Sequence, residues 1–189
     1  NAGLGKGAPL GTGKAAANIE TVQTNLVGAL AQAEAALEIF RAQNAGHLVL
    51  ISSISGVRGM PKAQAAYSAS KAGLTALGQG LQAEFASSPI TVSVVAPGYI
   101  ETQLTHDWWN EQADPAAAKR ATLDLQPMKR IGRPEEVAMT AVFLASDEAP
   151  FINATCITVD GDTSTSDTVL AFATGAAGVV ALVGGPLAL

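Results

Sequence analysis

His47-Leu-Val-Leu-Ile-Ser52 is a short, continuously apolar run with a branched residue at each of its central positions. Such a run is typical of a central strand in a parallel sheet, because helices cover both faces of that strand. Two similar runs follow, over residues 90–96 and 155–159, and turn residues bound them. The sequence therefore predicts a sheet of buried parallel strands.

Segments with helical periodicity separate these strands. Apolar residues recur every three or four positions from Val22 to Phe40, and residues 67–85 are rich in Ala and Leu. Arg133-Pro134-Glu135-Glu136 has the proline and acidic residues that favour a helix start. Residues 103–125 are polar, so we expect one or two irregular helices that form a flap. The alternation predicts an α/β fold with right-handed crossovers and helices on both faces of a parallel sheet.

Composition narrows the class of function. The chain has 189 residues, 48% apolar and 14% charged, which suits one folded domain. Its net charge of −5 and its 11 scattered Lys and Arg residues argue against nucleic acid and anionic membranes and favour a small-molecule partner. The single cysteine, Cys156, makes a cytoplasmic location the simplest interpretation. His47 and His106 lie far apart without a carboxylate at metal-ligand spacing, so no metal site is predicted.

Tyr67-Ser-Ala-Ser-Lys71 carries the candidate chemistry. Residues four apart on a helix share one face, so the ammonium group of Lys71 can approach the phenol of Tyr67. A positive charge at ~4 Å stabilises phenolate by roughly 4 kcal/mol at an effective dielectric constant of about 20, which lowers the phenol pKa by about three units. General acid–base catalysis then becomes possible near neutral pH. The alternative is an ordinary surface pair, because this pattern is common by chance.

Further motifs, in the right order, resemble those of the short-chain dehydrogenase/reductase family. Tyr67–Gly73 is similar to the active-site helix of that family, and Ile51-Ser52-Ser53-Ile-Ser-Gly56 resembles the segment that supplies its catalytic serine, with Ser53 in the matching position. Asn25 matches its helix asparagine. The other similarities are to its N-A-G turn, its nicotinamide-side loop and its C-terminal signature: Asn1-Ala2-Gly3, Pro97-Gly98-Tyr-Ile100-Glu-Thr102, and Arg130–Val137 with Val159–Gly161.

The resemblance implies a fold and a reaction. The chain would be the C-terminal portion of a Rossmann-like doubly wound parallel sheet, in an oxidoreductase that transfers a hydride between NAD or NADP and an alcohol or carbonyl substrate. Family members commonly form dimers or tetramers through helices such as residues 18–45 and 67–85, so a homo-oligomer, for example a homotetramer, is expected.

The resemblance also implies roles for individual residues. Tyr67 would exchange the proton, and Lys71 would lower its pKa and bind the nicotinamide ribose. Ser53 would stabilise the substrate oxygen, and Asn25 would hold a water that links Lys71 to solvent. The cofactor would contact Tyr67 and Lys71, and also Asn1, Ala2, Gly3, Pro97, Gly98, Ile100 and Thr102.

The sequence departs from the family in two places. A dinucleotide site needs a Gly-rich turn between a first strand and a first helix, and these residues contain no such turn after a strand. We therefore expect residues 1–162 to be an N-terminally truncated catalytic domain. Residues 163–189 form an apolar tail of unknown role, uncharged from Thr168 to Leu189. Its glycines and lack of flanking cations disfavour a membrane anchor, and a disordered extension or an extra buried element is left open.

Three questions stay open at the level of sequence: the class of function, the substrate and the role of two tryptophans. The chain is either part of an oxidoreductase or a non-catalytic remnant that is tail-anchored or binds a partner through an exposed sheet edge. The flap, residues 103–125, would select the substrate but contains no diagnostic constellation of acids and bases. Trp108 and Trp109 fit a substrate pocket and an oligomer surface equally well. Glu135 and Glu136 are interpreted as helix-start charges.

Overall fold

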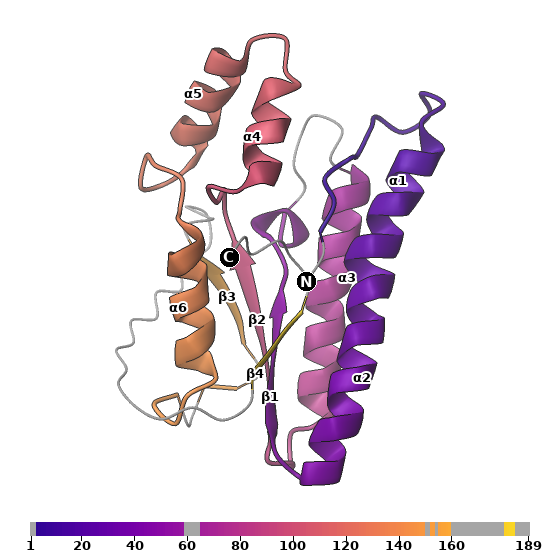
Figure 1. The fold of residues 1–189 in the computed structure, drawn as a ribbon, viewed down its shortest axis with the longest axis vertical. Coiled ribbons are helices and arrows are strands. Elements are labelled where there is room, and N and C mark those ends of the chain that lie inside the picture. The colour runs from indigo at the N-terminus through magenta and orange to yellow at the C-terminus, as the bar shows by residue number, and fades with distance from the viewer. Residues whose placement is uncertain (1–2, 59–64, 150–151, 154, 160–179, 184–189) are drawn as a thin grey trace.

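A parallel sheet runs through the centre of the molecule (Figure 1). The computed structural model describes residues 3–58, 65–149, 152–153, 155–159 and 180–183. Within these residues the sheet has four strands in the order β3-β2-β1-β4. The strands are β1 (Gly46–Ile51), β2 (Ile90–Pro97), β3 (Cys156–Val159) and β4 (Val180–Val183), and every pairing between them is parallel. The predicted parallel sheet is confirmed.

Helices cover both faces of this sheet (Figure 1). One face carries a long rod made of α1 (Ala15–Val22), the π-helical turn η1 (Gln23–Val27) and α2 (Gly28–Gln43), with α3 (Ala65–Glu84) beside it. The opposite face carries α6 (Pro134–Leu144). The predicted flap is a pair of helices, α4 (Gln103–Asn110) and α5 (Pro115–Leu125), which stands beyond the carboxyl ends of β1 and β2.

Alternate side chains of β1 and β2 pack against opposite helical layers, because successive side chains of a strand point to opposite faces. One set joins buried residues of α2 and α3, and the other joins buried residues of α6. The first cluster includes Leu48, Leu50, Val92, Val94, Phe40 and Leu74, and the second includes Val49, Ile51, Val95, Val137, Ala141 and Leu144. Burial on both faces is the reason that the 47–52 run shows no polar alternation.

The apolar tail supplies the outer strand on the β1 side of the sheet. Val180–Val183 pairs in parallel with His47–Leu50, so β1 has a neighbour on each edge. The partner-binding alternative relied on an exposed sheet edge, and here strand β4 covers the edge of β1. The rest of the tail lies outside the described residues. In the described part of the chain, no helix is long and apolar enough to cross a bilayer.

Candidate active site

A cavity of about 650 Å³ opens at the carboxyl ends of β1 and β2. Ligands of open parallel sheets bind at this end of the strands, and the volume is typical of a small-molecule site. The walls come from the N-terminal segment, the loops after β1 and β2, the start of α3, and α4. Most of the residues predicted from the sequence are among those that line it: Ser53, Tyr67, Lys71, Pro97, Gly98, Ile100 and Thr102.

Lys71 is buried on the cavity side of α3. Its side chain is 2% exposed, and its Nζ atom donates to the carbonyl oxygen of Ile51 at 3.0 Å. The same nitrogen lies 5.9 Å from the ring centroid of Tyr67, so the two side chains share one helix face as predicted. Burial lowers the pKa of Lys71 from 10.5 to about 8, because desolvation penalises the ammonium form.

Tyr67 has a raised pKa. Burial is the largest cause, and a hydrogen bond with the side chain of Ser53 opposes it. The Lys71 ammonium alone was expected to lower this pKa. The opposite direction arises because burial destabilises the phenolate more than the surrounding groups stabilise it. At neutral pH the phenol of this structure is therefore protonated and able to donate.

The loop after β1 is held tightly against α3. The hydroxyl of Ser52 donates to the Lys71 carbonyl at 2.9 Å and lies 2.7 Å from the Thr75 hydroxyl, so Ser52 anchors the loop. A Cβ atom on Gly56 would lie 2.6 Å from the carbonyl carbon of Lys71, so only glycine fits at this contact. The adjacent Ser53 hydroxyl accepts from the main-chain N–H of Ser55 at 3.1 Å. These contacts fix Ser53 beside Tyr67.

Asn25 lies in the π-helical turn η1 and is completely buried, but it does not line the cavity. Its side-chain amide hydrogen-bonds the main chain of Leu4 and donates to the hydroxyl of Ser70 at 3.1 Å. The predicted role for Asn25 was to hold a water. In this structure its side chain instead hydrogen-bonds the N-terminal segment and Ser70.

The N-terminal segment forms one wall of the cavity through Gly5, Lys6, Gly7 and Pro9. Gly3, which the sequence placed at the cofactor, is described but does not line the cavity. Asn1 and Ala2 lie outside the described residues. The wall was missed in the sequence because the glycines of this segment follow no strand and show no periodicity.

The loop from Pro97 to Thr102 is locked to the start of α6. The N–H of Gly132 donates to the Tyr99 carbonyl at 2.9 Å, and the N–H of Glu101 donates to the Gly132 carbonyl at 2.8 Å. Ile100 and Gly132 form an isolated parallel bridge. The loop from Pro97 to Thr102 and the segment that begins α6 are thus one structural unit.

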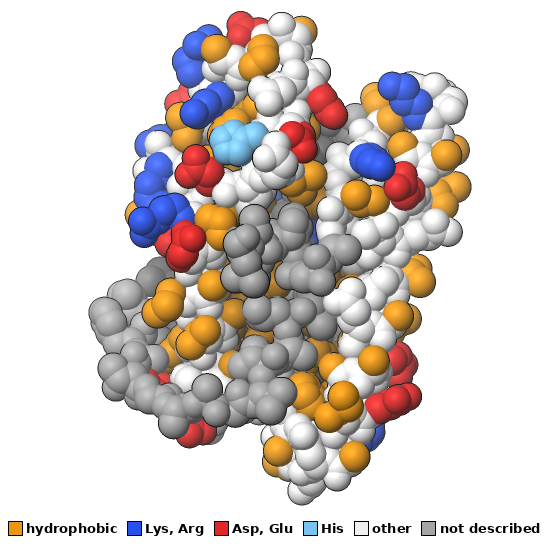
Figure 2. Space-filling model, viewed as in Figure 1, with side chains coloured by type: hydrophobic (Ala, Val, Ile, Leu, Met, Phe, Trp, Pro, Cys, Tyr) orange, Lys and Arg blue, Asp and Glu red, His pale blue; other side chains and the backbone are white. Residues whose placement is uncertain are grey.

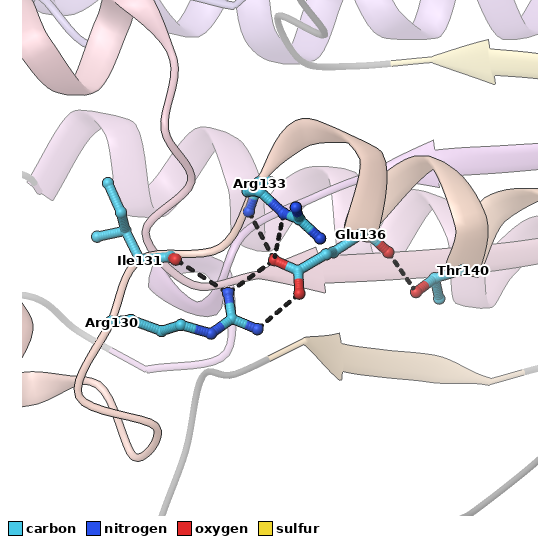
Figure 3. Close-up of polar contacts among 5 residues, drawn as sticks. All are labelled: Arg130, Ile131, Arg133, Glu136 and Thr140. Atoms are coloured by element: carbon cyan, nitrogen blue, oxygen red, sulfur yellow. Dashed lines mark hydrogen bonds and ion pairs between the residues drawn. The ribbon is translucent and has the colours of Figure 1, made fainter.

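A carboxylate organises the α6 end of this unit (Figure 3). Glu136 receives both arms of the Arg130 guanidinium, at 2.6 and 2.8 Å, and also accepts from the main-chain N–H of Arg133 at 2.8 Å. These bonds lower the pKa of Glu136 from 4.5 to about 2, with the Arg130 hydrogen bond as the largest cause. Glu136 is therefore more than the helix-start charge that the sequence predicted.

Residues of α4 complete the cavity, and the sequence identified few of them. Leu104, Thr105 and Trp108 line it, with Glu111 and Gln112 just after the helix end. Their spacing of three and four residues is helical, and this was the signal that could have revealed them. The loop before α4 adds Tyr99, whose pKa burial raises.

The two adjacent tryptophans have different roles. Trp108 lines the cavity. Trp109 is 4% exposed and its indole N–H donates to the Thr122 hydroxyl at 3.0 Å, so it joins α4 to α5. The sequence left a substrate pocket and an oligomer surface open for both residues, and Trp108 lies in the pocket. Trp109 lies in neither, because it is buried between α4 and α5.

Comparison with known proteins gives consistent matches. The family model described as enoyl-(acyl carrier protein) reductase matches residues 1–163. An uncharacterized oxidoreductase of Mycobacterium tuberculosis is 58% identical over 105 residues, which are 56% of this chain and 42% of the relative. Levodione reductase of Leifsonia aquatica is 34% identical over 168 residues, which are 87% of this chain and 62% of the relative.

Solved structures agree with this result. The crystal structure of levodione reductase superimposes with a TM-score of 0.77 at 34% identity, over 85% of this chain and 63% of that one. A variant of actinorhodin polyketide ketoreductase, solved with NADPH, also gives 0.77 at 28% identity, over 85% of this chain and 64% of that one. The chain spans 42% to 62% of the length of the two curated relatives named above. With the family model covering most of its residues, the chain belongs to the short-chain dehydrogenase/reductase family.

Proposed function

We propose that this chain is the nicotinamide- and substrate-binding part of an oxidoreductase that interconverts ketones and secondary alcohols. The observation that carries the proposal is the convergence of Ser53, Tyr67 and Lys71 in one cavity at the carboxyl end of the sheet. The hydrogen bond between Ser53 and Tyr67 and the shared helix face of Tyr67 and Lys71 give the proton-transfer group defined neighbours. Relatives named as a levodione reductase and a polyketide ketoreductase support a carbonyl substrate.

The cavity residues fit the nicotinamide end of NAD or NADP. The loop from Pro97 to Thr102 offers a glycine and main-chain groups that a planar ring can approach, and Lys71 offers an ammonium donor inside the wall. The residues that would hold the cofactor are Tyr67, Lys71, Pro97, Gly98, Ile100 and Thr102. A Gly-rich cradle for the pyrophosphate is not found among the described residues, so the proposal covers this end of the cofactor.

The proposed reduction transfers a hydride and a proton to the carbonyl group of the substrate. When bound, the reduced nicotinamide supplies a hydride, which carries the electron pair to the carbonyl carbon. Tyr67 donates its phenolic proton to the carbonyl oxygen, so that the C=O bond becomes CH–OH, and the phenolate then regains a proton from solvent. Ser53 donates a hydrogen bond to the oxygen on which charge develops. Oxidation of the alcohol is the reverse of these steps.

The protonation states support the reductive direction. Burial keeps the pKa of Tyr67 above its ordinary value, so the group that must give a proton holds one at neutral pH. The pKa of Lys71 is about 8, so its ammonium form predominates at neutral pH. This positive charge stabilises the Tyr67 phenolate as it forms. Asn25 supports the site by holding the N-terminal wall, and a water on its main-chain carbonyl would connect Lys71 to solvent.

The decisive experiment compares Tyr67→Phe with wild type in the full-length protein. NADH and NADPH binding is titrated by fluorescence, and reduction of a panel of ketones is followed at the nicotinamide absorbance. We expect Tyr67→Phe to bind cofactor as wild type does and to lose at least about a hundredfold in kcat, which is the low end of general-acid contributions. Thr140→Val removes a hydroxyl from the outer part of α6 and should leave the rate unchanged. Equal rates for wild type and Tyr67→Phe would refute the proposed proton donor.

We also propose that the protein self-associates through the outer face of the long helical rod and α3. Apolar side chains are exposed along the rod, at Ile19, Val27, Leu30 and Ile39, and Figure 2 shows hydrophobic side chains along that edge. Exposed residues of α3 are mostly small, which allows close approach of a second copy.

Light scattering should give the mass of a dimer or tetramer, and Leu30→Glu should reduce this mass. A monomeric wild type at micromolar concentration would contradict this.

A further inference from the structure

Two faces of helix α4 have different surroundings. Leu104, Thr105 and Trp108 face the cavity, while Trp109 is buried against α5. The Leu104 side chain reaches across to the N-terminal wall, where a Cβ atom on Gly5 would lie 3.3 Å from it. The side of α4 that faces the cavity therefore forms a wall with an apolar residue, Leu104, and an aromatic residue, Trp108.

Trp108 forms an aromatic pair with Tyr99. Their ring centroids are 6.0 Å apart and their planes are tilted by 43°, which is within the range of favourable aromatic contacts. Both rings line the cavity, one from α4 and the other from the loop after β2. The pair therefore makes a continuous aromatic wall from two separate elements.

The backbone on each side of this wall is held in place by hydrogen bonds. The N–H of Tyr99 donates to the Gln126 side chain at 3.3 Å, and its carbonyl accepts from Gly132. On the α4 side, the Gln112 side chain donates to the Trp108 carbonyl at 2.8 Å. Rings that are positioned before a ligand arrives lose little conformational freedom on binding.

The wall stands next to the proton donor. Tyr99 is close enough to Tyr67 that its charge contributes to the raised pKa of Tyr67. Tyr67, Ser53, Tyr99 and Trp108 all line the same cavity, so a substrate whose carbonyl oxygen meets Tyr67 and Ser53 can extend its nearest substituent along the Tyr99–Trp108 wall.

Charge in the cavity argues against an anionic substrate group at this wall. Among the lining residues that the structure describes, the ionisable groups outside the Ser53–Tyr67–Lys71 cluster and Tyr99 are Lys6 and Glu111. Lys6 forms an ion pair with Glu20 at 3.2 Å, and Glu111 would repel a carboxylate or a phosphate. The Arg58 guanidinium also acts on Tyr99, where it opposes the rise in pKa, but Arg58 is not among the residues that line the cavity. The lining of the wall itself therefore suits an uncharged group.

We propose that the Tyr99–Trp108 wall is the specificity determinant of the site, and that it selects uncharged ketones with a ring next to the carbonyl carbon, together with the matching secondary alcohols. This inference rests on the proposed carbonyl chemistry and adds the class of substrate. Stacking of the substrate ring on the indole of Trp108 supplies the preference.

The test compares two ketones, acetophenone and 2-butanone, in wild type, Trp108→Ala and Trp108→Phe. For Trp108→Ala we expect kcat/KM for acetophenone to fall about tenfold, the size of an aromatic contact with its buried area, while 2-butanone changes less than about twofold. Trp108→Phe keeps a ring and should retain most of the preference. An equal loss for both ketones would overturn the inference, because it would make Trp108 a structural residue.

A binding measurement separates this inference from the proposed function. Acetophenone should quench tryptophan emission of the wild type saturably, and the quenching should largely vanish in Trp108→Phe, which retains Trp109 as the one tryptophan within these 189 residues. If Tyr67→Phe keeps full activity, the proposed proton donor fails whatever the quenching shows. If Tyr67→Phe is inactive but the quenching is the same in wild type and Trp108→Phe, the aromatic wall alone is refuted.

Discussion

Asn18 and Asn25 lie seven residues apart, on one face of the long helical rod, and both hold the N-terminal segment by its main chain. Asn25 accepts from the N–H of Leu4 at 2.8 Å and donates to its carbonyl at 2.9 Å, as a neighbouring strand would. Asn18 accepts from the N–H of Ala8 at 2.8 Å. Since residues 5–7 line the cavity, the two asparagines position one wall of the site without contacting a ligand.

Asn25→Leu should release this wall. The variant keeps the approximate size of the side chain but leaves the polar groups of Leu4 without partners, so we expect a loss of about 1–3 kcal/mol in the free energy of unfolding. Amide exchange of Leu4 should accelerate by at least about tenfold. Asn18→Ala is the matched comparison, because it should accelerate exchange at Ala8 and spare Leu4. Unchanged exchange at Leu4 in Asn25→Leu would show that other contacts hold the segment.

Gly56→Ala should displace the loop that carries Ser53. The added Cβ atom would meet main-chain atoms of Lys71 at 2.6 and 2.8 Å, and main chain cannot move aside as a flexible side chain can. We expect a loss of about 1–3 kcal/mol in stability, as for other overpacked sites. Gly80→Ala on α3 is the matched control, because its Cβ atom meets nothing within 4 Å. This control should be neutral or gain up to about 1 kcal/mol from helix propensity. Urea unfolding of both variants checks the contrast.

Lys71 should give the folded state a distinctive alkaline pH dependence. Its pKa falls from 10.5 to about 8 on burial, so between these values the unfolded chain binds a proton that the folded chain has released. The stability of wild type relative to Lys71→Met should therefore rise from pH 8 to pH 10, by at most about 1.4 kcal/mol per pH unit. Below pH 8 the difference should be constant. Urea unfolding at several pH values measures it, with Lys14→Met as an exposed control variant.

The sequence predicted strands β1, β2 and β3 and the chemistry-bearing helix because each carries a local pattern. The 47–52 run is apolar because helices cover both faces of its strand. Tyr67 and Lys71 share a face because they are four residues apart on a helix. Such signals depend on neighbours in the chain. Ser53 was identified differently, through the resemblance of residues 51–56 to the family's serine segment, and the structure adds that Gly56 of this segment packs closely against α3.

The remaining parts of the site depend on contacts between distant segments. Nothing near Asn25 in sequence reveals that its amide would bind Leu4, 21 residues away. The pairing of β1 with residues 180–183 joins segments with no shared motif. The direction of the Tyr67 pKa was also missed, because an estimate from one charge at one distance omits the desolvation that dominates in the folded chain.

Glu136 should make the loop between β2 and α4 sensitive to acid. Its pKa falls from 4.5 to about 2 in the folded state, so its contribution to stability is present above pH 4.5 and is lost as the pH falls towards 2. The difference in stability between wild type and Glu136→Gln should therefore shrink over this interval. Because Gly132 joins this end of α6 to Tyr99 and Glu101, the variant should also speed amide exchange at Glu101 and Gly132.

Glu135→Gln provides the matched control for that measurement. Glu135 is the exposed neighbour in the same helical turn, and its replacement removes the same charge from the start of α6 without touching the Arg130 fork. Amide exchange at Glu101 should not change in this variant. If the two variants behave alike, the effect is a general helix-dipole term, and the link from α6 to the cavity loop does not depend on the Arg130–Glu136 pair.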